Sequence, residues 1–290
     1  MNALALHTPA PCRVDGPATR TAFAEIGRAA TLALYDELAL APKPGLVSFV
    51  DSGSHDDMDA RTFMRSLFAL RRTFPHFVAL GAQGVPFAEL EREGIAAEAR
   101  MLKATGGINT HRGAIFTLGL LCAAAGRLLQ QREALGAQTL RRTMLASWGD
   151  ALAARAHRAS DSHGARAARR FDLRSVGVEA AEGFPVLFET ALPTLRDALH
   201  RGLTPQQARS DALFATMARL DDTNVAHRGG LGGLRWVQRA ARDYLAAGGS
   251  ARSDAQAHAL ALHRAFVARR LSPGGAADVL AAACWIQRIT

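Results

Sequence analysis

One stretch of the chain concentrates the residue types that bind metal ions and move protons. Asp51, Asp56, Asp57 and Asp59 lie within nine positions, and His55 lies among them. Asp59 is well placed to cap the helix expected after it, so helix capping explains one aspartate but not four. Hard oxygen ligands at this spacing suit Mg²⁺, which usually takes one or two carboxylates together with substrate phosphates. The spacing therefore favours a magnesium site over a merely polar, acidic turn.

A second acidic stretch lies far along the chain, in residues 220–230. Asp221, Asp222 and Asn224 offer oxygen ligands there, and Arg228 stands before two glycines. The stretch can be an ordinary loop between helices. A single polar cleft lined by both acidic stretches, however, explains better why acids followed by a cation and glycines occur in both halves of the chain. The candidate metal ligands are therefore Asp56, Asp57, Asp59, Asp221 and Asp222.

The segment Thr105–Gly113 predicts a site for an anion, most simply a phosphate. Two consecutive glycines near its start allow positive φ angles and a close approach of a ligand to the backbone. Asn109 and Thr110 can cap the next helix, whose first turn would then carry His111 and Arg112. Free amides, a helix dipole and a fixed cation in one place suit a phosphate, although a capped turn without a ligand has the same composition.

The loop Leu271–Gly275 has related features. Ser272 is a suitable cap, Pro273 suits the first helical position, and the two glycines would expose amides to an anion. The residues expected to bind nucleotide phosphates are Lys43, Gly107, Asn109, Thr110, Arg112, Arg228, Ser272, Gly274 and Gly275.

Helices must position these segments. Only 6% of the residues are aromatic, while alanine and leucine dominate, which favours helices over strands. Apolar residues recur at helical spacing in residues 20–40, 86–103 and 137–160, and a strong start signal opens a helix at 204–220. We therefore expect an all-α fold, with residues 19–290 forming a single multi-helix domain whose polar, glycine-rich loops converge on one cleft. Residues 1–18 are expected to form a flexible arm.

The formal charge of +9 indicates an anionic partner. Much of the excess lies in the arginine-rich residues 127–174, but aromatic residues for base stacking are nearly absent there. A solvated helix face is therefore favoured over a nucleic-acid site. The three cysteines lack pair spacing, no signal peptide is evident, and the longest apolar stretch, Ala114–Gly126, is too short to cross a bilayer. We expect a cytoplasmic protein with no membrane partner.

Several familiar nucleotide motifs are absent from the sequence. It contains no Gly-x-x-x-x-Gly-Lys-Ser/Thr loop, no strand followed by Gly-x-Gly-x-x-Gly, and no protein-kinase motif set. If ATP binds to this chain, it binds to another scaffold.

Seven short motifs follow one another along the chain: Pro42-Lys-Pro-Gly-Leu-Val, His55-Asp-Asp-Met-Asp59, Gly107-Ile-Asn-Thr-His-Arg-Gly113, Ser162-His-Gly, Gly183-Phe-Pro, Asp222-Thr-Asn and Leu271-Ser-Pro-Gly-Gly. This ordered set, over nearly all of residues 30–288, resembles the triphosphoribosyl-dephospho-CoA synthase family. Within that family the chain is most similar to the branch associated with malonate decarboxylase rather than citrate lyase. Arg112 stands where a lysine is common in relatives, so a forked cation replaces a point charge.

The resemblance implies that ATP and 3′-dephospho-CoA give 2′-(5″-triphosphoribosyl)-3′-dephospho-CoA and free adenine. The 2′-hydroxyl of dephospho-CoA would attack the anomeric carbon of the ATP ribose, and the triphosphate would be kept. The product would pass to a carrier-protein phosphoribosyl transferase, as the prosthetic-group precursor for the acyl carrier subunit of malonate decarboxylase.

Ribosyl transfer passes through a cationic sugar, which nearby carboxylates stabilise. The candidate catalytic residues are Asp57, expected to be the general base, Glu37 as its substitute, and His111. Mg²⁺ and the cations Lys43, His111, Arg112 and Arg228 would neutralise the triphosphate. Two alternatives are a magnesium-dependent ATP phosphohydrolase or kinase and a basic helical module that binds nucleic acid. The oligomeric state is open, with a homodimer as one candidate.

Overall fold

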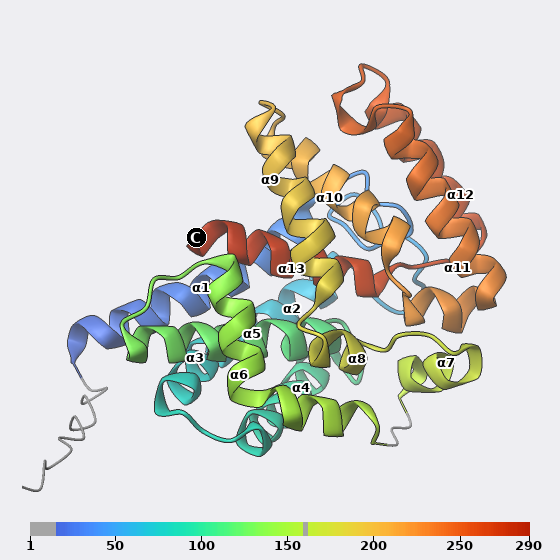
Figure 1. Cartoon of the computed structure of the whole chain (residues 1–290). Helices are drawn as coiled ribbons and strands as arrows, with labels where there is room; N and C mark the ends of the chain where they lie inside the picture. The colour runs from blue at the N-terminus through green and yellow to red at the C-terminus, as the bar shows by residue number, and fades with distance from the viewer. Residues whose placement is uncertain (1–15, 159–161) are drawn as a thin grey trace, which may run out of the picture.

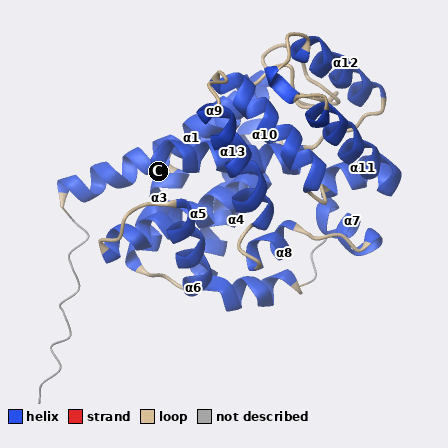
Figure 2. Cartoon of the chain, turned by 45° about the horizontal axis from the view of Figure 1, so that its top comes forward, coloured by secondary structure: helices blue, strands red, loops and turns tan. Residues whose placement is uncertain are grey.

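The computed structural model describes residues 16–158 and 162–290, and its regular structure there is entirely helical (Figures 1 and 2). The helices are α1 (Pro17–Ala39), α2 (Ala60–Leu70), α3 (Thr73–Gln83), α4 (Phe87–Thr105), α5 (Arg112–Gln131), α6 (Ala137–Ala156), α7 (His163–Phe171), α8 (Val176–Ala181), the π-helical η1 (Leu187–Ala191), α9 (Leu192–His200), α10 (Pro205–Arg219), α11 (Thr223–Ala246), the 3₁₀-helical η2 (Gly249–Ala251), α12 (Ala255–Ala268) and α13 (Gly274–Ile289). The all-α prediction is therefore confirmed. Of the predicted arm 1–18, residues 1–15 lie outside the described residues, and Pro17 already begins α1.

Two apolar helices, α5 and α13, form the centre of the fold. Almost every residue from Ala114 to Gly126 of α5 is buried, and so is every residue from Leu280 to Ile286 of α13. The two helices pack against each other, and α1 packs against both α3 and α13. Figure 1 shows α13, in red, passing through the middle of the molecule between α1 and α10.

Helix α5 has the length and hydropathy of a membrane-spanning helix, but 72% of its most apolar stretch is buried inside the protein. The sequence predicts that the longest apolar segment is too short to cross a bilayer. That prediction is wrong, because the helix that contains the segment continues to Gln131. Its burial is that of a core helix.

Glycines allow α3 and α5 to cross closely. A Cβ on Gly126 would lie 1.9 Å from the carbonyl oxygen of Val78, and a Cβ on Gly81 would lie 1.8 Å from the carbonyl oxygen of Ala123. No real Cβ approaches an oxygen so closely, so this crossing requires a glycine on each helix. The close contact fixes the position of α5 against α3.

The second half of the chain packs on the same core. Phe214 of α10 stacks on Tyr244 of α11 with ring centroids 3.8 Å apart, and the Tyr244 hydroxyl lies 3.0 Å from the Ser250 hydroxyl. Helix α7 packs against α11, and α8 packs against α6. The buried apolar residues form one continuous cluster from α1 to α13, which agrees with a single domain.

Several predicted helix starts are present. Thr204 and Gln207 form a complete capping box at the start of α10, and Asp59 caps α2 by accepting the Thr62 N–H at 2.8 Å. The loop expected at residues 220–230 is wrong, because α11 already begins at Thr223. The glycine-rich part only breaks that helix, at Gly230, where φ is 63°.

Candidate active site

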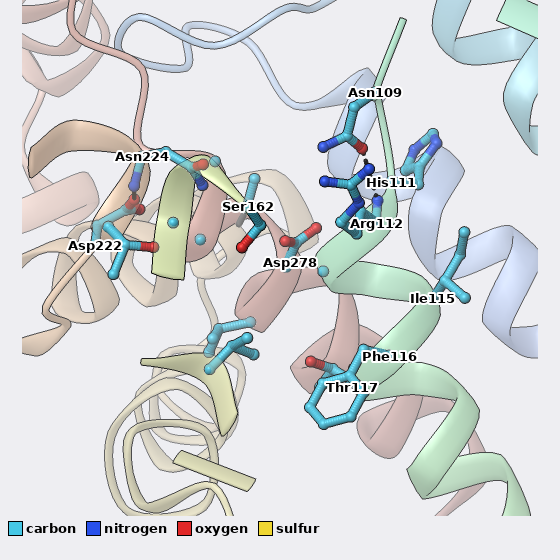
Figure 3. Close-up of a pocket in the computed structure, with 18 of the residues that line it drawn as sticks. Asn109, His111, Arg112, Ile115, Phe116, Thr117, Ser162, Asp222, Asn224 and Asp278 are labelled. Atoms are coloured by element: carbon cyan, nitrogen blue, oxygen red, sulfur yellow. Dashed lines mark hydrogen bonds between the residues drawn. The ribbon is translucent and has the colours of Figure 1, made fainter. Parts of the chain in front are cut away.

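Four helices begin at the wall of one large cavity, which has a volume of about 1120 Å³. Figure 3 shows Asn109 and Arg112 at the start of α5, Ser162 before α7 and Asp222 before α11, arranged around Asp278 of α13. The first turn of α13 lines the same cavity. Because helix N-termini leave N–H groups unpaired and carry partial positive charge, their convergence makes this wall attractive to an anion.

The start of α5 is nearly as predicted. The Asn109 side-chain oxygen accepts the backbone N–H of Arg112 at 3.1 Å, but His111 occupies the N-cap position instead of the first turn. The Thr110 hydroxyl and His111 Nε2 are buried and lack a hydrogen-bond partner within residues 16–158 and 162–290. Both residues line the cavity. Unpaired buried polar atoms usually indicate a missing partner, and a polar ligand could supply one.

His111 cannot act as a cation at neutral pH. Its ring is buried, its Nδ1 lies 2.7 Å from the Ser66 hydroxyl, and Phe63 packs edge-on against it. Burial, with a smaller contribution from the Lys43 charge, lowers the pKa of His111 to about 3. The expectation that His111 adds positive charge for a triphosphate is therefore wrong, and a neutral hydrogen-bonding role is what the geometry allows.

Lys43 is not a free cation either. Its Nζ lies 2.5 Å from Glu37 Oε1 and donates to the Glu37 carbonyl oxygen at 2.8 Å, with both side chains buried at the cavity wall. Desolvation lowers the pKa of Lys43, and the Glu37 carboxylate opposes that shift. The pair engages two of the three N–H donors of Lys43, so its phosphate contact stays a prediction, and the partner that the structure gives it is Glu37.

The Gly106–Gly107 turn ends α4 instead of contacting the cavity. The φ angles are 71° and 91°, and the Gly107 N–H donates to the Leu102 carbonyl oxygen at 2.8 Å. Gly107 is not part of the cavity wall, so the expected phosphate contact is not found. Its glycine is explained by the left-handed backbone of a helix C-terminus.

Asp222 ties two helix starts together. One carboxylate oxygen accepts the N–H groups of Asn224 and Val225 at 2.9 and 3.2 Å, and the other accepts the Ala276 N–H at 2.9 Å. Burial raises its pKa, against the effect of these backbone hydrogen bonds. Because both oxygens already hold backbone donors, the metal-ligand assignment of Asp222 is corrected to a double helix cap.

The glycines that open α13 make that cap possible. A Cβ on Gly275 would lie 3.1 Å from Asp222 Oδ2, and one on Gly274 would lie 3.0 Å from the Asn224 side-chain nitrogen. Both glycines line the cavity, and their contact with phosphates stays a prediction. Ser272 does not cap α13, however, because Pro273 holds the N-cap position.

The other predicted metal ligands divide between the cavity and its surroundings. Asp57 and Asp221 line the cavity, whereas Asp56 and Asp59 do not, and the Asp59 carboxylate is occupied in capping α2. No cluster of three or more His, Cys, Asp or Glu side chains suited to a metal occurs in the described part of the chain. Two wall carboxylates still fit Mg²⁺ that is bound mainly through substrate phosphates.

Hydrogen bonds link the acidic loop before α2 to the loop before α13, and they involve Arg228, His55 and Ser272. Arg228 donates to the Ser54 carbonyl oxygen at 2.9 Å and lies 3.1 Å from His55 Nδ1, and His55 Nε2 lies 2.8 Å from the Ser272 hydroxyl. Burial lowers the pKa of Arg228, and the charges of Asp57 and Asp56 oppose that shift. The predicted cation therefore positions the acidic loop as well as lining the cavity.

Most cavity arginines are paired with glutamates. Arg112 pairs with Glu98, and Arg155 and Arg158 both pair with Glu91, at 3.0 and 2.7 Å. This pairing accounts for part of the arginine-rich region without any nucleic acid. Arg112 still lines the cavity, where its fork could reach an anion.

Sequence reasoning missed two features of the wall. Asp278 stands alone in the alanine-rich α13, so no neighbouring residue marks it as functional. His163 is the first residue of α7, and its Nδ1 lies 2.8 Å from His227 Nε2 of α11. Only the family-like motif Ser162-His-Gly pointed to that histidine.

The comparisons with known proteins agree with this geometry. No solved structure was found that matches the chain. The family model described as CitG, ATP:dephospho-CoA triphosphoribosyl transferase, matches residues 23–290, which include every residue that lines the cavity. The chain therefore belongs to the ATP:dephospho-CoA triphosphoribosyl transferase family, and it is an enzyme of the transferase class with ATP and dephospho-CoA as the family's substrates.

Proposed function

We propose that this enzyme transfers the triphosphoribosyl unit of ATP to the 2′-hydroxyl of 3′-dephospho-CoA and releases free adenine. The observation that carries the proposal is the convergence of the N-termini of α5, α7, α11 and α13 on one cavity. A triphosphate is the part of ATP that such a wall would hold. Because the triphosphate stays in the product, it serves as the handle that keeps the ribose in place.

The reaction breaks one bond and forms one at the same carbon. The bond from the ribose C1′ to adenine N9 breaks, and the bond from C1′ to the 2′-oxygen of dephospho-CoA forms. The hydroxyl loses its proton, and adenine gains one. The sugar carries positive charge between these events, so a wall containing Glu37 and Asp57 suits it electrostatically.

The cavity has room for two substrates. Small-molecule pockets usually measure about 300–1,000 Å³, and this one measures about 1120 Å³. The N-terminal turn of α5, with Asn109, Thr110 and Arg112, would hold phosphate oxygens, and Arg228 would do so from the second turn of α11. Holding both substrates in one site turns a bimolecular reaction into an effectively unimolecular one.

Mg²⁺ is the proposed cofactor. Asp57 and Asp221 are the wall carboxylates that would hold it, and it would supply charge neutralisation of the triphosphate. The other steps belong to the protein's own side chains. Asp57 is proposed as the base that takes the hydroxyl proton, because it is exposed at the cavity wall, where Asp57 Oδ1 lies 3.5 Å from His55 Nδ1. Glu37 is the substitute, although its pairing with Lys43 holds one of its oxygens.

The wider setting is also a proposal. Assignment to the malonate decarboxylase branch, with transfer of the product to a carrier-protein phosphoribosyl transferase, rests on the motif resemblance. A cytoplasmic location is supported by Cys122 and Cys284, which are buried free thiols. A homodimer remains a candidate state.

The deciding experiment incubates the enzyme with ATP, Mg²⁺ and 3′-dephospho-CoA and follows the products by chromatography with mass detection. We expect free adenine and a dephospho-CoA adduct that is heavier by one triphosphoribosyl unit. Formation of ADP or phosphate without adenine would replace the proposal with a phosphotransfer reaction. For the base, Asp57→Asn should slow adenine release by about 100-fold or more; near-normal turnover with unchanged Mg²⁺ dependence would reject that role.

A further inference from the structure

Asp278 is a half-buried carboxyl group in the cavity wall that no step above yet uses. It lies in the second turn of α13, and Figure 3 shows its carboxyl group directed into the space between Ser162 and the first turn of α5. The neighbouring residues Ala277 and Leu280 are buried in the core. The helix therefore fixes the backbone of Asp278 while its carboxyl group faces the cavity.

The first turn of α5 is built to accept this carboxyl group. A Cβ on Gly113 would lie only 2.0 Å from Asp278 Oδ2, so a glycine is needed where α5 passes the carboxyl group. The backbone N–H of Ala114 donates to the same carboxyl group. These two features define the position of the acid relative to the helix start that we assign to the triphosphate.

The charges around Asp278 favour its protonated form. Glu37 of α1 and Asp222 of α11 face it with negative charge, the Glu37 charge being paired with Lys43. On α5, His111 is neutral and Arg112 is paired with Glu98. Burial first, and then the charges of Glu37 and Asp222, raise the pKa of Asp278 well above its usual value, whereas the Ala114 N–H acts in the opposite direction. Asp57, in contrast, is exposed.

Two carboxyl groups in such different environments suit opposite proton-transfer roles. We infer that Asp278 is the general acid that protonates a ring nitrogen of the leaving adenine, N3 or N7, as the bond from C1′ to N9 breaks. The inference rests on the proposed function. The proton moves from the Asp278 carboxyl group to adenine, and the hydroxyl proton of dephospho-CoA moves to the base. After the products leave, the base releases its proton to solvent and Asp278 regains one from solvent.

A cycle of enzyme and substrate variants tests this inference. Wild-type enzyme and Asp278→Asn are assayed for base release with ATP, 3-deaza-ATP and 7-deaza-ATP, in which one ring nitrogen has been replaced by carbon. With ATP, we expect Asp278→Asn to be slower by about 100- to 10,000-fold, the usual contribution of a general acid. With the analogue that lacks the accepting nitrogen, the wild-type enzyme should also be slow, and the ratio of wild-type to variant rates should shrink towards one.

The same variant should change the pH dependence. In the wild type, kcat/KM should fall as the pH rises through the pKa of Asp278, because only the protonated acid can donate. This fall should be missing in Asp278→Asn. Asp243→Asn is the matched control, since Asp243 is exposed on α11 and lies outside the cavity wall; it should behave as wild type in every assay.

Three results would overturn the inference. One is an equal rate ratio of wild type to Asp278→Asn for all three nucleotides, which indicates a purely structural role. Another is wild-type turnover of both analogues at the rate of ATP, a measurement that does not depend on whether the variant folds. The third is adenine release by a folded Asp278→Asn at the wild-type rate. Absence of adenine from the wild-type reaction with ATP would instead reject the proposed function itself.

Discussion

At the scale of single residues, the acids of the cavity wall differ by what surrounds each carboxyl group. Asp222 accepts three backbone N–H groups, Glu37 is paired with Lys43, Asp278 is sheltered and Asp57 is exposed. The same functional group can therefore serve as a cap, an ion-pair partner, an acid or a base. The spacing of these residues along the chain could predict that several carboxyl groups line one cavity. It could not predict which carboxylate oxygens are left without a protein partner.

The buried Glu37–Lys43 pair gives a prediction about stability. Lys43→Met leaves Glu37 buried without its partner, and breaking a buried pair in this way costs about 3–5 kcal/mol. We expect that loss in the free energy of unfolding, measured in urea, and recovery of most of it in the double variant Glu37→Leu with Lys43→Met. Equal losses in the single and double variants would show that packing, not the unpaired charge, causes the effect.

His111 gives a prediction about pH. Its pKa is about 3 in the folded protein, against 6.5 for an ordinary histidine, so the unfolded chain binds the extra proton first as the pH falls. The contribution to stability is complete above pH 6.5 and is lost progressively towards pH 3. Between pH 7 and pH 5, this single group should cost about 2 kcal/mol, from 1.36 kcal/mol per pKa unit.

The test compares urea unfolding of the wild type with that of His111→Gln at both pH values. Glutamine can still hydrogen-bond to Ser66 but does not titrate. The wild type should lose about 2 kcal/mol more than the variant between pH 7 and pH 5. Parallel losses in the two proteins would mean that His111 is already protonated in the fold or that other groups dominate.

At the scale of elements, local sequence signals predicted helix starts well where the cap lies next to the helix it serves. The capping box at Thr204 and the Asp59 cap are both present. The same signals did not predict caps in which the capping residue and the capped helix are far apart in sequence. Asp222 serves α13 through Ala276, and the Ser272 hydroxyl bonds His55 instead of its own helix. Such partners are more than fifty positions apart in sequence, so no local pattern contains them.

The crossing of α3 and α5 gives a prediction at this scale. Gly126→Ala places a methyl group against the Val78 carbonyl oxygen, which is rigid helix backbone and cannot give way cheaply. We expect a loss of at least about 1–3 kcal/mol in the free energy of unfolding, the usual cost of overpacking a core. Gly232→Ala is the matched control, because nothing lies within 4 Å of that position in α11. It should be neutral or stabilise by up to about 1 kcal/mol, through the higher helix propensity of alanine.

The difference in unfolding free energy between the two variants tests whether α3 and α5 cross closely. If Gly126→Ala and Gly232→Ala have the same effect in urea unfolding, the close crossing does not exist in solution. Adenine release should fall with Gly126→Ala if the helices separate, because the start of α5 lines the cavity and is the proposed place of the triphosphate.

At the scale of the whole molecule, the residue types in distant segments could predict that these segments meet at one cavity. They could not predict which side chains contact one another there. Acids, cations and glycines recur in both halves of the chain, which favoured one cleft, and segments around Asn109, Ser162, Asp222 and Gly274 do line one cavity. Asp278 remained hidden because its significance depends on Glu37 and Gly113, which come from two other helices. Pairings of this kind are set by tertiary packing rather than by local sequence.

The arrangement of helix starts around the cavity also bears on how the net charge of +9 attracts an anion. Several arginines are already paired with glutamates around the cavity, so the attraction for an anion should be local to the four helix starts rather than spread over the surface. Inorganic tripolyphosphate, which carries the anionic part of ATP without its base or sugar, should therefore bind in the cavity. At 100 times its dissociation constant it should stabilise the fold by about 2.7 kcal/mol, which corresponds to a rise in Tm of several degrees.

Thermal unfolding in the presence of Mg²⁺, with NaCl at matched ionic strength as the reference, measures this effect. Arg112→Gln should reduce the rise in Tm, because Arg112 lies at the start of α5 in the cavity wall, whereas Arg235→Gln, on an exposed part of α11 outside that wall, should not. A rise no larger than that given by NaCl would mean that the charge acts only by general screening. An equal reduction by both substitutions would place the binding on the outer surface. A rise that depends on Arg112 and not on Arg235 would show that helix starts contributed by separate parts of the chain act together as one anion site.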